Sequence, residues 1–549
     1  MEALKFAPLP KLKIWGVYLV YAAVVLLILW PLLAPGYILT LDIIFTPKLP
    51  LPSQIGSSYL LQLVLHVLNF MLPGDVVEKL LLVFTLLLTG IGMHRLLGYI
   101  GAKNSRGIAL LGCYTAGIFY IVNPFTYSRF MAGQYNVLLG YALLPWFTHC
   151  LFVWFGAQNW RRTLALSAWI TAIGVVSIHT FAMLPLVVVL GLGSALWQHR
   201  QLDYWRALAK WLGILLMICF VASSYWLVPA MLGHGTIADS VASFGQAQRQ
   251  AYATADTNGA GTLPAVLGLQ GFWADVRQLY ILPNDAIEHW WLWQLLLWMV
   301  LAAGIVAAFR RDRARAVYFT LLAGAATVLA LGFLSDWLAS HLPFFAGFRE
   351  PQKFVMLLTL AYAYFIYQAV MLFAGAFKRV KWLQFLPALL VSAVVALYSW
   401  PMWWGMDTQL HPVQYPADWY AVNAQLDRDT SSGSVLFLPW HLYMSFGFAD
   451  RIIANPAPKF FDWPVIVSDN PEFNTAGPSV YDPLKYQLSN TVLPAAAAGK
   501  PVTARLRQLG IRYILLAKEL DWQQYNYWGA QPGLRLQANT HTLLLYKIE

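Results

Sequence analysis

The chain has 549 residues, of which 59% are hydrophobic and 11% are charged, whereas soluble domains carry about 25% charged residues. Together with a mean hydropathy of +0.56, this composition excludes a soluble globular protein and predicts one surrounded by lipid. The net charge of +11 comes from short Lys and Arg runs between apolar segments, where membrane proteins carry orientation signals, so we expect no nucleic-acid partner.

Eleven apolar stretches are long enough to cross about 30 Å of hydrocarbon at roughly 1.5 Å per residue. They cover residues 14–33, 76–97, 107–122, 136–155, 163–178, 181–197, 211–230, 291–309, 316–334, 354–377 and 382–400. The first is too long for the core of a signal peptide, so we expect it to remain as a span. Residues 163–197 alternatively form one long tilted span, but basic clusters at both ends favour two crossings. The sequence therefore predicts an α-helical polytopic membrane protein with about eleven transmembrane helices.

Basic residues collect at alternate connections between these spans, as they do in cytoplasmic loops. The groups are Lys5 to Lys13, Arg95 with Lys103 and Arg106, Arg161 with Arg162, Arg200 with Arg206 and Lys210, Arg310 to Arg315, and Lys378 to Lys381. We therefore expect a protein of the cytoplasmic membrane with a cytoplasmic N-terminus and an exoplasmic C-terminus. The exoplasmic side receives the loops 35–75 and 231–290, and functional residues concentrate on such connections.

Residues 59–72 in the first exoplasmic loop form an apolar run that is short for a span. Gln62, His66 and Asn69 are spaced four and three apart, which places them in a polar stripe on one side of a helix. We expect this helix to lie in the plane of the membrane interface. The alternative, a twelfth short span, would break the alternation of basic loops.

The composition changes after residue 400, where charged residues and turn signals become frequent. Residues 434–438, 511–516 and 542–548 are compact apolar runs with strand character, and 504–509 read as the end of a helix stopped by Gly510. We therefore expect two domains, a transmembrane domain over 1–400 and an exoplasmic soluble α/β domain over 401–549.

Asp42 is the only carboxylate in residues 35–58, and its neighbours are apolar. A partly shielded acid near the membrane surface can act as a general base, although a solvated loop acid is the simpler interpretation. Arg349, Glu350 and Lys353 lie directly before a long span, where cations can hold a phosphate at headgroup depth or merely anchor the helix end.

Three further candidates lie on the same predicted side of the membrane. Arg129 and Gln134 occupy a short polar link between two spans, and His179 lies at the exoplasmic end of another. The ordinary polarity of helix ends explains any one of these residues alone. What supports a functional role is that all of them lie on the same predicted side of the membrane. The chain has no Walker-type glycine-rich loop, no HExxH motif and no serine nucleophile elbow, so ATP hydrolysis and peptidase chemistry are not expected.

Several stretches resemble a known superfamily, the GT-C glycosyltransferases, and in particular arabinofuranosyltransferase-like multi-span proteins. The stretches are Asn123 and Pro124 through Arg129, Gly133 with Gln134, Leu144 to Trp146, Phe348 to Glu350, and Leu509 to Leu515. The resemblance covers most of the chain. It implies a GT-C-like transmembrane domain and the transfer of a sugar from a polyprenyl-phosphate donor to an acceptor hydroxyl on the exoplasmic face, in the assembly of a cell-envelope glycan or glycolipid.

The resemblance also assigns roles to the candidate residues. Asp42 would be the catalytic base, and Arg349, Lys353 and Arg129 would bind the donor phosphate. The substrate-binding residues would be Gln134, His179 and Glu350, and the anomeric centre would be inverted. No second acid adjoins Asp42 as a paired-acid motif would require, so no metal site is assigned, no cofactor is certain, and a divalent cation stays open. The alternative function is a non-catalytic transporter, scramblase or scaffold for lipid-linked glycans.

Overall fold

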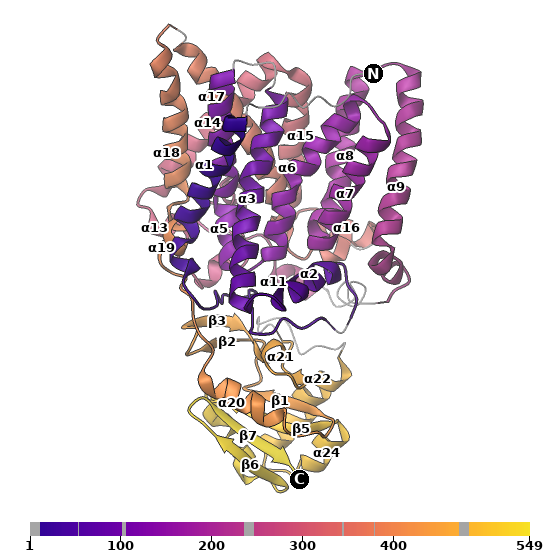
Figure 1. Ribbon diagram of the computed structural model, residues 1–549, viewed down its shortest axis with the longest axis vertical. Helices are drawn as coiled ribbons and strands as arrows, with labels where there is room; N and C mark the ends of the chain where they lie inside the picture. The colour runs from indigo at the N-terminus through magenta and orange to yellow at the C-terminus, as the bar shows by residue number, and fades with distance from the viewer. Residues whose placement is uncertain are drawn as a thin grey trace.

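The computed structural model describes residues 11–52, 54–101, 106–234, 246–342, 345–377, 379–470 and 482–549. Of the basic residues used above for orientation, Lys5, Lys103 and Lys378 lie outside these ranges. The molecule consists of a bundle of long helices with a smaller domain, which contains the β-strands, at one end of the bundle (Figure 1).

Among the described residues, eight segments are long and apolar enough to cross a membrane. They are α1 (Lys11–Leu29) with the turn after it, α3 (Gly74–Ile100), α4 (Arg106–Ile121) with α5 (Pro124–Met131), α6 (Tyr135–Gly156), α8 (Ile178–Gln198), α9 (Leu202–Met231), α14 (Trp290–Arg311) and α17 (Val355–Ala376) with the turn before it. Two bent helix pairs raise the number to ten if each is one span. They are α15 (Arg313–Ala330) with α16 (Ser335–His341), bent by 93°, and α18 (Leu386–Tyr398) with α19 (Trp403–Asp407) and their turns, bent by 77°. The helical membrane architecture is thus confirmed.

The predicted spans at residues 163–178 and 181–197 are two separate helices in the structure. The first is α7 (Trp160–Val176), whose 17 residues rise roughly 26 Å, at the short end of the lengths that cross about 30 Å of hydrocarbon. Ser177 follows, and its side chain accepts a hydrogen bond from the backbone N–H of Thr180 and caps α8. Residues 163–197 therefore form two helices rather than one long tilted span.

Helix α17 lies at the centre of the bundle, and almost all of its residues are buried. A helix that is apolar on every face has no side suited to water, which explains this position. Helices α4, α14, α15 and α18 pack around it. Gly304 allows α14 to approach α17 closely, because a Cβ atom at that position would come within 2.0 Å of the Phe365 carbonyl oxygen.

The short helix predicted after the first span is α2 (Tyr59–Asn69), and it lies at the end of the bundle beside the C-terminal domain (Figure 1). Its polar stripe holds the preceding loop: His66 Nδ1 donates to the Leu49 carbonyl at 2.6 Å, and Asn69 Oδ1 accepts from the Leu49 N–H at 2.9 Å. The apolar side chains of Val64 and Val67 are exposed. These contacts leave an uncovered apolar face, which is what a helix in the membrane interface needs.

The C-terminal domain is built on a five-stranded mixed sheet in the order β4-β1-β5-β7-β6. The strands are β1 (Ser434–Leu438), β4 (Val465–Ile466), β5 (Ile511–Ala517), β6 (Leu534–Asn539) and β7 (Leu543–Ile548). β1 pairs in parallel with β4 and β5, whereas β7 is antiparallel to β5 and β6. All three strand candidates of the sequence are strands here, and α24 (Thr503–Gln508) ends before Gly510, whose φ of +76° suits glycine. The predicted C-terminal α/β fold is confirmed.

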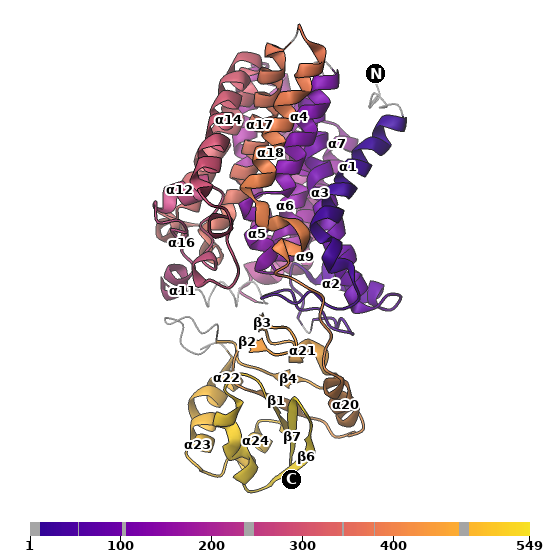
Figure 2. The same cartoon turned by 90° about the vertical axis from the view of Figure 1, so that its left-hand side faces the viewer.

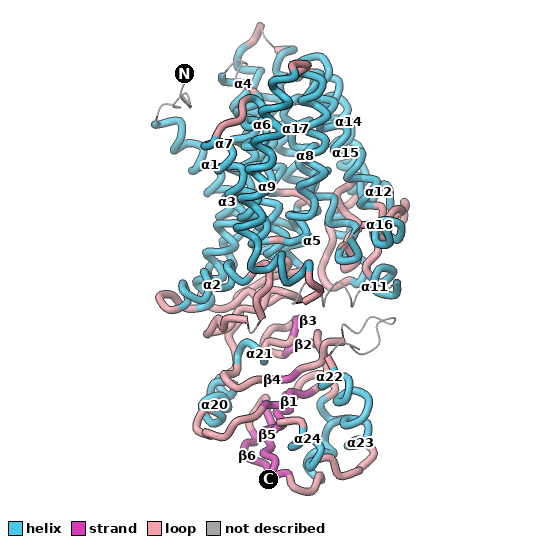
Figure 3. Tube along the Cα trace, turned by 90° about the vertical axis from the view of Figure 1, so that its right-hand side faces the viewer, coloured by secondary structure: helices cyan, strands magenta, loops and turns pink. Residues whose placement is uncertain are grey.

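A second, smaller sheet connects the domain to the bundle. It is the antiparallel hairpin of β2 (Tyr443–Phe446) and β3 (Arg451–Ala454), which lies with α21 (Ala457–Phe460) on the side of the domain facing the helices (Figure 2, Figure 3). The loop after α1 docks on this side. Its Tyr37 exchanges two backbone hydrogen bonds with Val413, and the Leu41 carbonyl accepts from the N–H of Ala454 at 2.8 Å.

Candidate functional site

Asp42 lies where the loop after α1 is held between the bundle and the C-terminal domain. On the bundle side, its backbone N–H donates to the Ala132 carbonyl at 3.2 Å, just after α5. The neighbouring Thr40 hydroxyl donates to the Met131 carbonyl at 2.6 Å. The loop is therefore seated on the C-terminal end of α5, and the next helix turn places Arg129 close by.

The backbone before Asp42 is in an unusual conformation. Leu41 has a φ of +31°, a region that side-chain-bearing residues rarely occupy and that costs about 1–3 kcal/mol. The hydrogen bond from Ala454 to the Leu41 carbonyl, together with a parallel bridge between Leu41 and Ile453, holds it there. The hairpin of the C-terminal domain thus sets the direction in which the Asp42 side chain leaves the loop.

The Asp42 carboxylate is exposed, and its Oδ1 atom accepts a hydrogen bond of 2.6 Å from the Tyr443 hydroxyl in β2. Desolvation by the surrounding protein raises the pKa of Asp42 above its ordinary value, and Glu350 adds to the rise. The hydrogen bond from Tyr443 and the charges of Arg349 and Lys353 act in the opposite direction. Asp42 is therefore an accessible acid with an increased affinity for a proton, as a general base requires.

A buried charge network, which consists of Arg129, Gln134, Glu350, Gln352 and Lys353, lies next to Asp42. Arg129 Nη1 donates to Glu350 at 2.7 Å and to Gln134 Oε1 at 2.6 Å, and Arg129 Nη2 donates to Gln352. Glu350 also pairs with Lys353 at 3.2 Å. The side chains of Arg129, Glu350 and Lys353 are at most 5% exposed. The sequence placed these residues on one side of the membrane, and the fold brings them into contact.

His179 extends this network from the first turn of α8. Lys353 Nζ lies 3.1 Å from His179 Nε2, and because an ammonium group can only donate, the imidazole nitrogen accepts and the ring is neutral. The ring packs edge-on against Phe348, with centroids 5.7 Å apart. All seven candidate residues of the sequence thus lie in or beside one site, and His179 serves as a hydrogen-bond acceptor for Lys353.

The charges in the network do not balance. Burial alone would raise the pKa of Glu350, but Lys353 and Arg129 hold it well below its usual range, so Glu350 is an anion. Glu350, together with the buried Asp275 that acts on Arg129, thus stands against the three cations of Arg129, Lys353 and Arg349. The excess of positive charge in a poorly hydrated setting favours an anion arriving beside Asp42.

The described part of the loop 231–290 covers the network. The Arg129 guanidinium stacks at 3.9 Å on the Phe272 ring, and the Gln352 amide donates to the Gln270 carbonyl at 3.3 Å. The Arg349 guanidinium lies 4.2 Å from the ring centre of Tyr252. Sequence reasoning left this loop without assigned residues, and it also missed Gln352 and Tyr443.

Gly133 is a close-packing position of the site. Its φ is +72°, and a Cβ atom there would lie 2.3 Å from the Ile43 nitrogen and 2.5 Å from the Thr40 carbonyl oxygen. Gly133→Ala should therefore displace the Asp42 loop and lower the stability by at least about 2 kcal/mol. Thermal unfolding in detergent measures the change. Gly324→Ala, in α15 with open space around it, is the matched control, and equal melting temperatures for the two variants would contradict the prediction.

The donor set beside Asp42 does not fit a divalent cation. Among the described residues, no group of three or more His, Cys, Asp and Glu side chains is placed to hold a metal ion. Glu350, an acid whose charge acts on Asp42, is engaged by Arg129 and Lys353. We therefore derive no chemical step that uses a metal.

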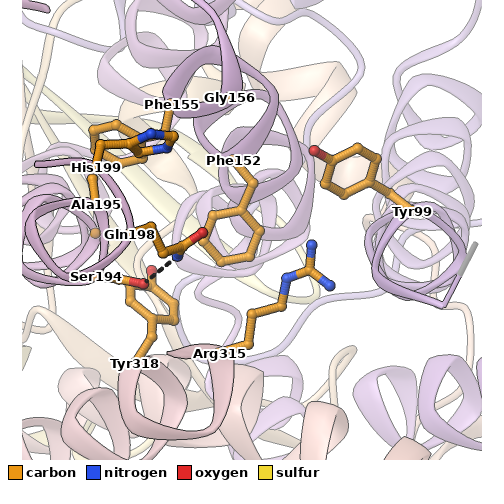
Figure 4. A pocket seen from close by; sticks show the side chains of 11 residues that line it. Tyr99, Phe152, Phe155, Gly156, Ser194, Ala195, Gln198, His199, Arg315 and Tyr318 are labelled. Carbon is orange, nitrogen blue, oxygen red and sulfur yellow. Dashed lines mark hydrogen bonds between the residues drawn. The ribbon is translucent and has the colours of Figure 1, made fainter. Parts of the chain in front are cut away.

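A separate pocket lies far from Asp42, between the ends of α3, α6 and α8 and the beginning of α15. Its lining includes Tyr99, Phe152, His199, Arg315 and Tyr318 (Figure 4). Arg315 is paired with Asp312 at 3.1 Å and donates to the Ile100 carbonyl. None of the seven candidate residues lines this pocket, so it does not belong to the site.

Neither a protein-family profile nor a curated protein sequence matches the chain. Among solved structures, the arabinofuranosyltransferase AftD from Mycobacteria superposes with a TM-score of 0.62 and 15% identity, over 98% of this chain and 40% of that chain. A mutant form of the same enzyme gives 0.60 and 16%, over 98% and 41%. The apo oligosaccharyltransferase of Archaeoglobus fulgidus gives 0.49 and 11%, over 92% and 69%. The chain spans about two fifths of the length of AftD. It is an integral membrane protein with the GT-C-like fold that its motifs predicted, followed by a C-terminal α/β domain.

Proposed function

We propose that this protein is a membrane glycosyltransferase that moves a sugar from a polyprenyl-phosphate donor to an acceptor hydroxyl on the exoplasmic face. The observation that carries the proposal is the neighbourhood of Asp42. An exposed carboxylate with a raised pKa lies beside a buried network that carries more positive than negative charge. One group can take a proton from an acceptor, and the other can stabilise a departing phosphate.

In the proposed reaction, Asp42 removes the proton from the acceptor hydroxyl while the hydroxyl oxygen attacks the anomeric carbon of the donor. The bond between that carbon and the phosphate oxygen breaks, and polyprenyl phosphate leaves with the electron pair. Arg349 is partly exposed, so it can contact the phosphate directly. Arg129 and Lys353 are buried, so they act on the phosphate through their electrostatic field. Attack opposite to the leaving group inverts the anomeric centre.

The other three candidates support these cations. Gln134 and Glu350 bond to Arg129, and His179 accepts from Lys353. We therefore assign them to holding the cations in place, in addition to the substrate contacts that the family resemblance implies. Such bonds keep donors directed at the position where charge develops, so that no reorganisation is needed during the reaction.

The placement of charge supports the orientation of the proposed reaction. The basic junction of Arg310, Arg311 and Arg313 lies between α14 and α15, at the end of the bundle far from the C-terminal domain (Figure 2). Basic connections favour the cytoplasmic side. The site at the opposite end would then face the exoplasm, where nucleotide sugars are absent and a lipid-linked donor supplies the energy.

A donor comparison in proteoliposomes tests the proposal. The purified chain is given radiolabelled polyprenyl-phosphate pentoses and hexoses, with the arabinofuranose included because it is the sugar named for AftD, and the same sugars as nucleotide donors. We expect transfer to a glycan acceptor from a lipid donor alone, with release of polyprenyl phosphate and an inverted linkage. Transfer from nucleotide sugars would contradict the proposal, as would movement of a labelled lipid-linked glycan between leaflets without transfer.

A further inference from the structure

The contact between Asp42 and the C-terminal domain joins two parts of the chain that are far apart in the sequence. Tyr443 and Asp42 are separated by 401 positions, and their hydrogen bond is 2.6 Å long. The backbone pairing of Leu41 with the hairpin holds the two residues in register. The domain therefore contacts both the side chain and the backbone of the proposed base.

The proton in this contact belongs to the tyrosine. Burial raises the pKa of Tyr443 far above its ordinary value, and the negative charge of Asp42 raises it further, so the hydroxyl stays protonated and donates. A hydrogen bond donated to a carboxylate favours its ionised form. The bond occupies Oδ1. Within the described part of the chain, the second carboxylate oxygen, Oδ2, receives no hydrogen bond, so it stays available for a proton.

From this geometry we propose that Tyr443 is a positioning residue that holds the Asp42 carboxylate ionised and turned with Oδ2 toward the acceptor, so that the C-terminal domain completes the catalytic site. The inference rests on the proposed function in assigning Asp42 as the base. It assigns to the C-terminal domain a part in the proton transfer itself, in addition to any role in binding a glycan.

Other charged and titratable groups also act on Asp42, and a substitution that tests Tyr443 must leave them unchanged. From the membrane domain and its loops these are Tyr135, Tyr252, Arg349, Glu350 and Lys353, and from the C-terminal domain they are Tyr443 and Lys459. Of these described groups, Tyr443 donates a hydrogen bond to the carboxylate, and the others act on it through their charge. Tyr443→Phe removes its hydroxyl and leaves the other groups in place.

Carbodiimide coupling of glycine ethyl ester measures the ionisation of Asp42 without relying on enzymatic activity, because the reagent attacks protonated carboxyl groups. The extent of coupling at Asp42 is followed against pH by peptide mass spectrometry, with Asp285 in the same sample as the reference carboxyl. In Tyr443→Phe we expect the midpoint for Asp42 to move upward by about one pH unit. Tyr486→Phe, an exposed tyrosine of the same domain, should leave the midpoint unchanged.

The acidic limb of the pH dependence of sugar transfer provides the second measurement. Since the ionised carboxylate is the active form, a raised pKa moves this limb to higher pH and leaves the rate on the alkaline side largely intact. A purely structural role would lower the rate equally at every pH. Identical coupling midpoints in wild type and Tyr443→Phe would overturn the inference. Full transfer by Asp42→Asn would instead overturn the assignment of the base, whatever the midpoints show.

Discussion

Asp42→Asn is expected to lower the rate of sugar transfer by about 10²–10⁴-fold, because the amide cannot accept the proton of the acceptor hydroxyl. The substitution keeps the size of the side chain, and its carbonyl oxygen can still accept the hydrogen bond from Tyr443. The fold should therefore survive, and donor binding should weaken little. Transfer from a radiolabelled polyprenyl-phosphate sugar in proteoliposomes measures the rate, and melting in detergent checks the fold.

The pH dependence of the wild type gives the same prediction an independent check. Desolvation raises the pKa of Asp42, so the carboxylate form, which is the active one, is lost at a higher pH than for an ordinary aspartate as the pH falls. The acidic limb of the rate profile should lie higher than an ordinary aspartate would give. Asp285→Asn is the control, because Asp285 is an exposed acid of the covering loop outside the site. Equal rates for Asp42→Asn and Asp285→Asn would exclude Asp42 as the base.

The membrane architecture could be predicted from the sequence because the length of an apolar run is a local property. The local signal is weakest at α7, because Arg161 and Arg162 lie within the first helical turn and the remaining apolar part is short. Three of the five strands of the C-terminal sheet were also local signals, since each is a compact apolar run. These apolar runs do not indicate how the sheet packs against the helical bundle.

The site shows the same division between local and long-range information. Arg349, Glu350 and Lys353 lie together in one stretch, and their charges were sufficient to predict them as candidates. The neutral Gln352 between them was not predicted. A glutamine within such a charged stretch is the signal that could have found it. That Arg129 bonds to Glu350, 221 positions away, depends on the packing of α5 against the segment before α17. Nothing local marks Tyr443 as the partner of Asp42.

Removing Glu350 is expected to destabilise the protein by about 3–5 kcal/mol, because it leaves two buried cations without their counter-ion. Glu350 is bonded to both Arg129, at 2.7 Å, and Lys353, at 3.2 Å, in a region that water does not reach. Arg129→Met removes one cation and leaves Glu350 paired with Lys353. Glu350→Gln should therefore lower the free energy of unfolding more than Arg129→Met does. SDS-induced unfolding in mixed micelles measures both changes.

The double variant decides whether these costs arise from one shared network. Because the two side chains contact each other, Arg129→Met with Glu350→Gln should cost less than the sum of the single changes, by about 0.5–3 kcal/mol. The lowered pKa of Glu350 means that its contribution is present above the ordinary glutamate pKa and is lost only in strong acid. Asp203→Asn, which breaks a solvent-exposed pair with Arg206, should change stability by less than about 0.5 kcal/mol. Additive costs for Arg129 and Glu350 would show that the excess positive charge beside Asp42 is not held by this pair, and the proposed phosphate stabilisation would lose its support.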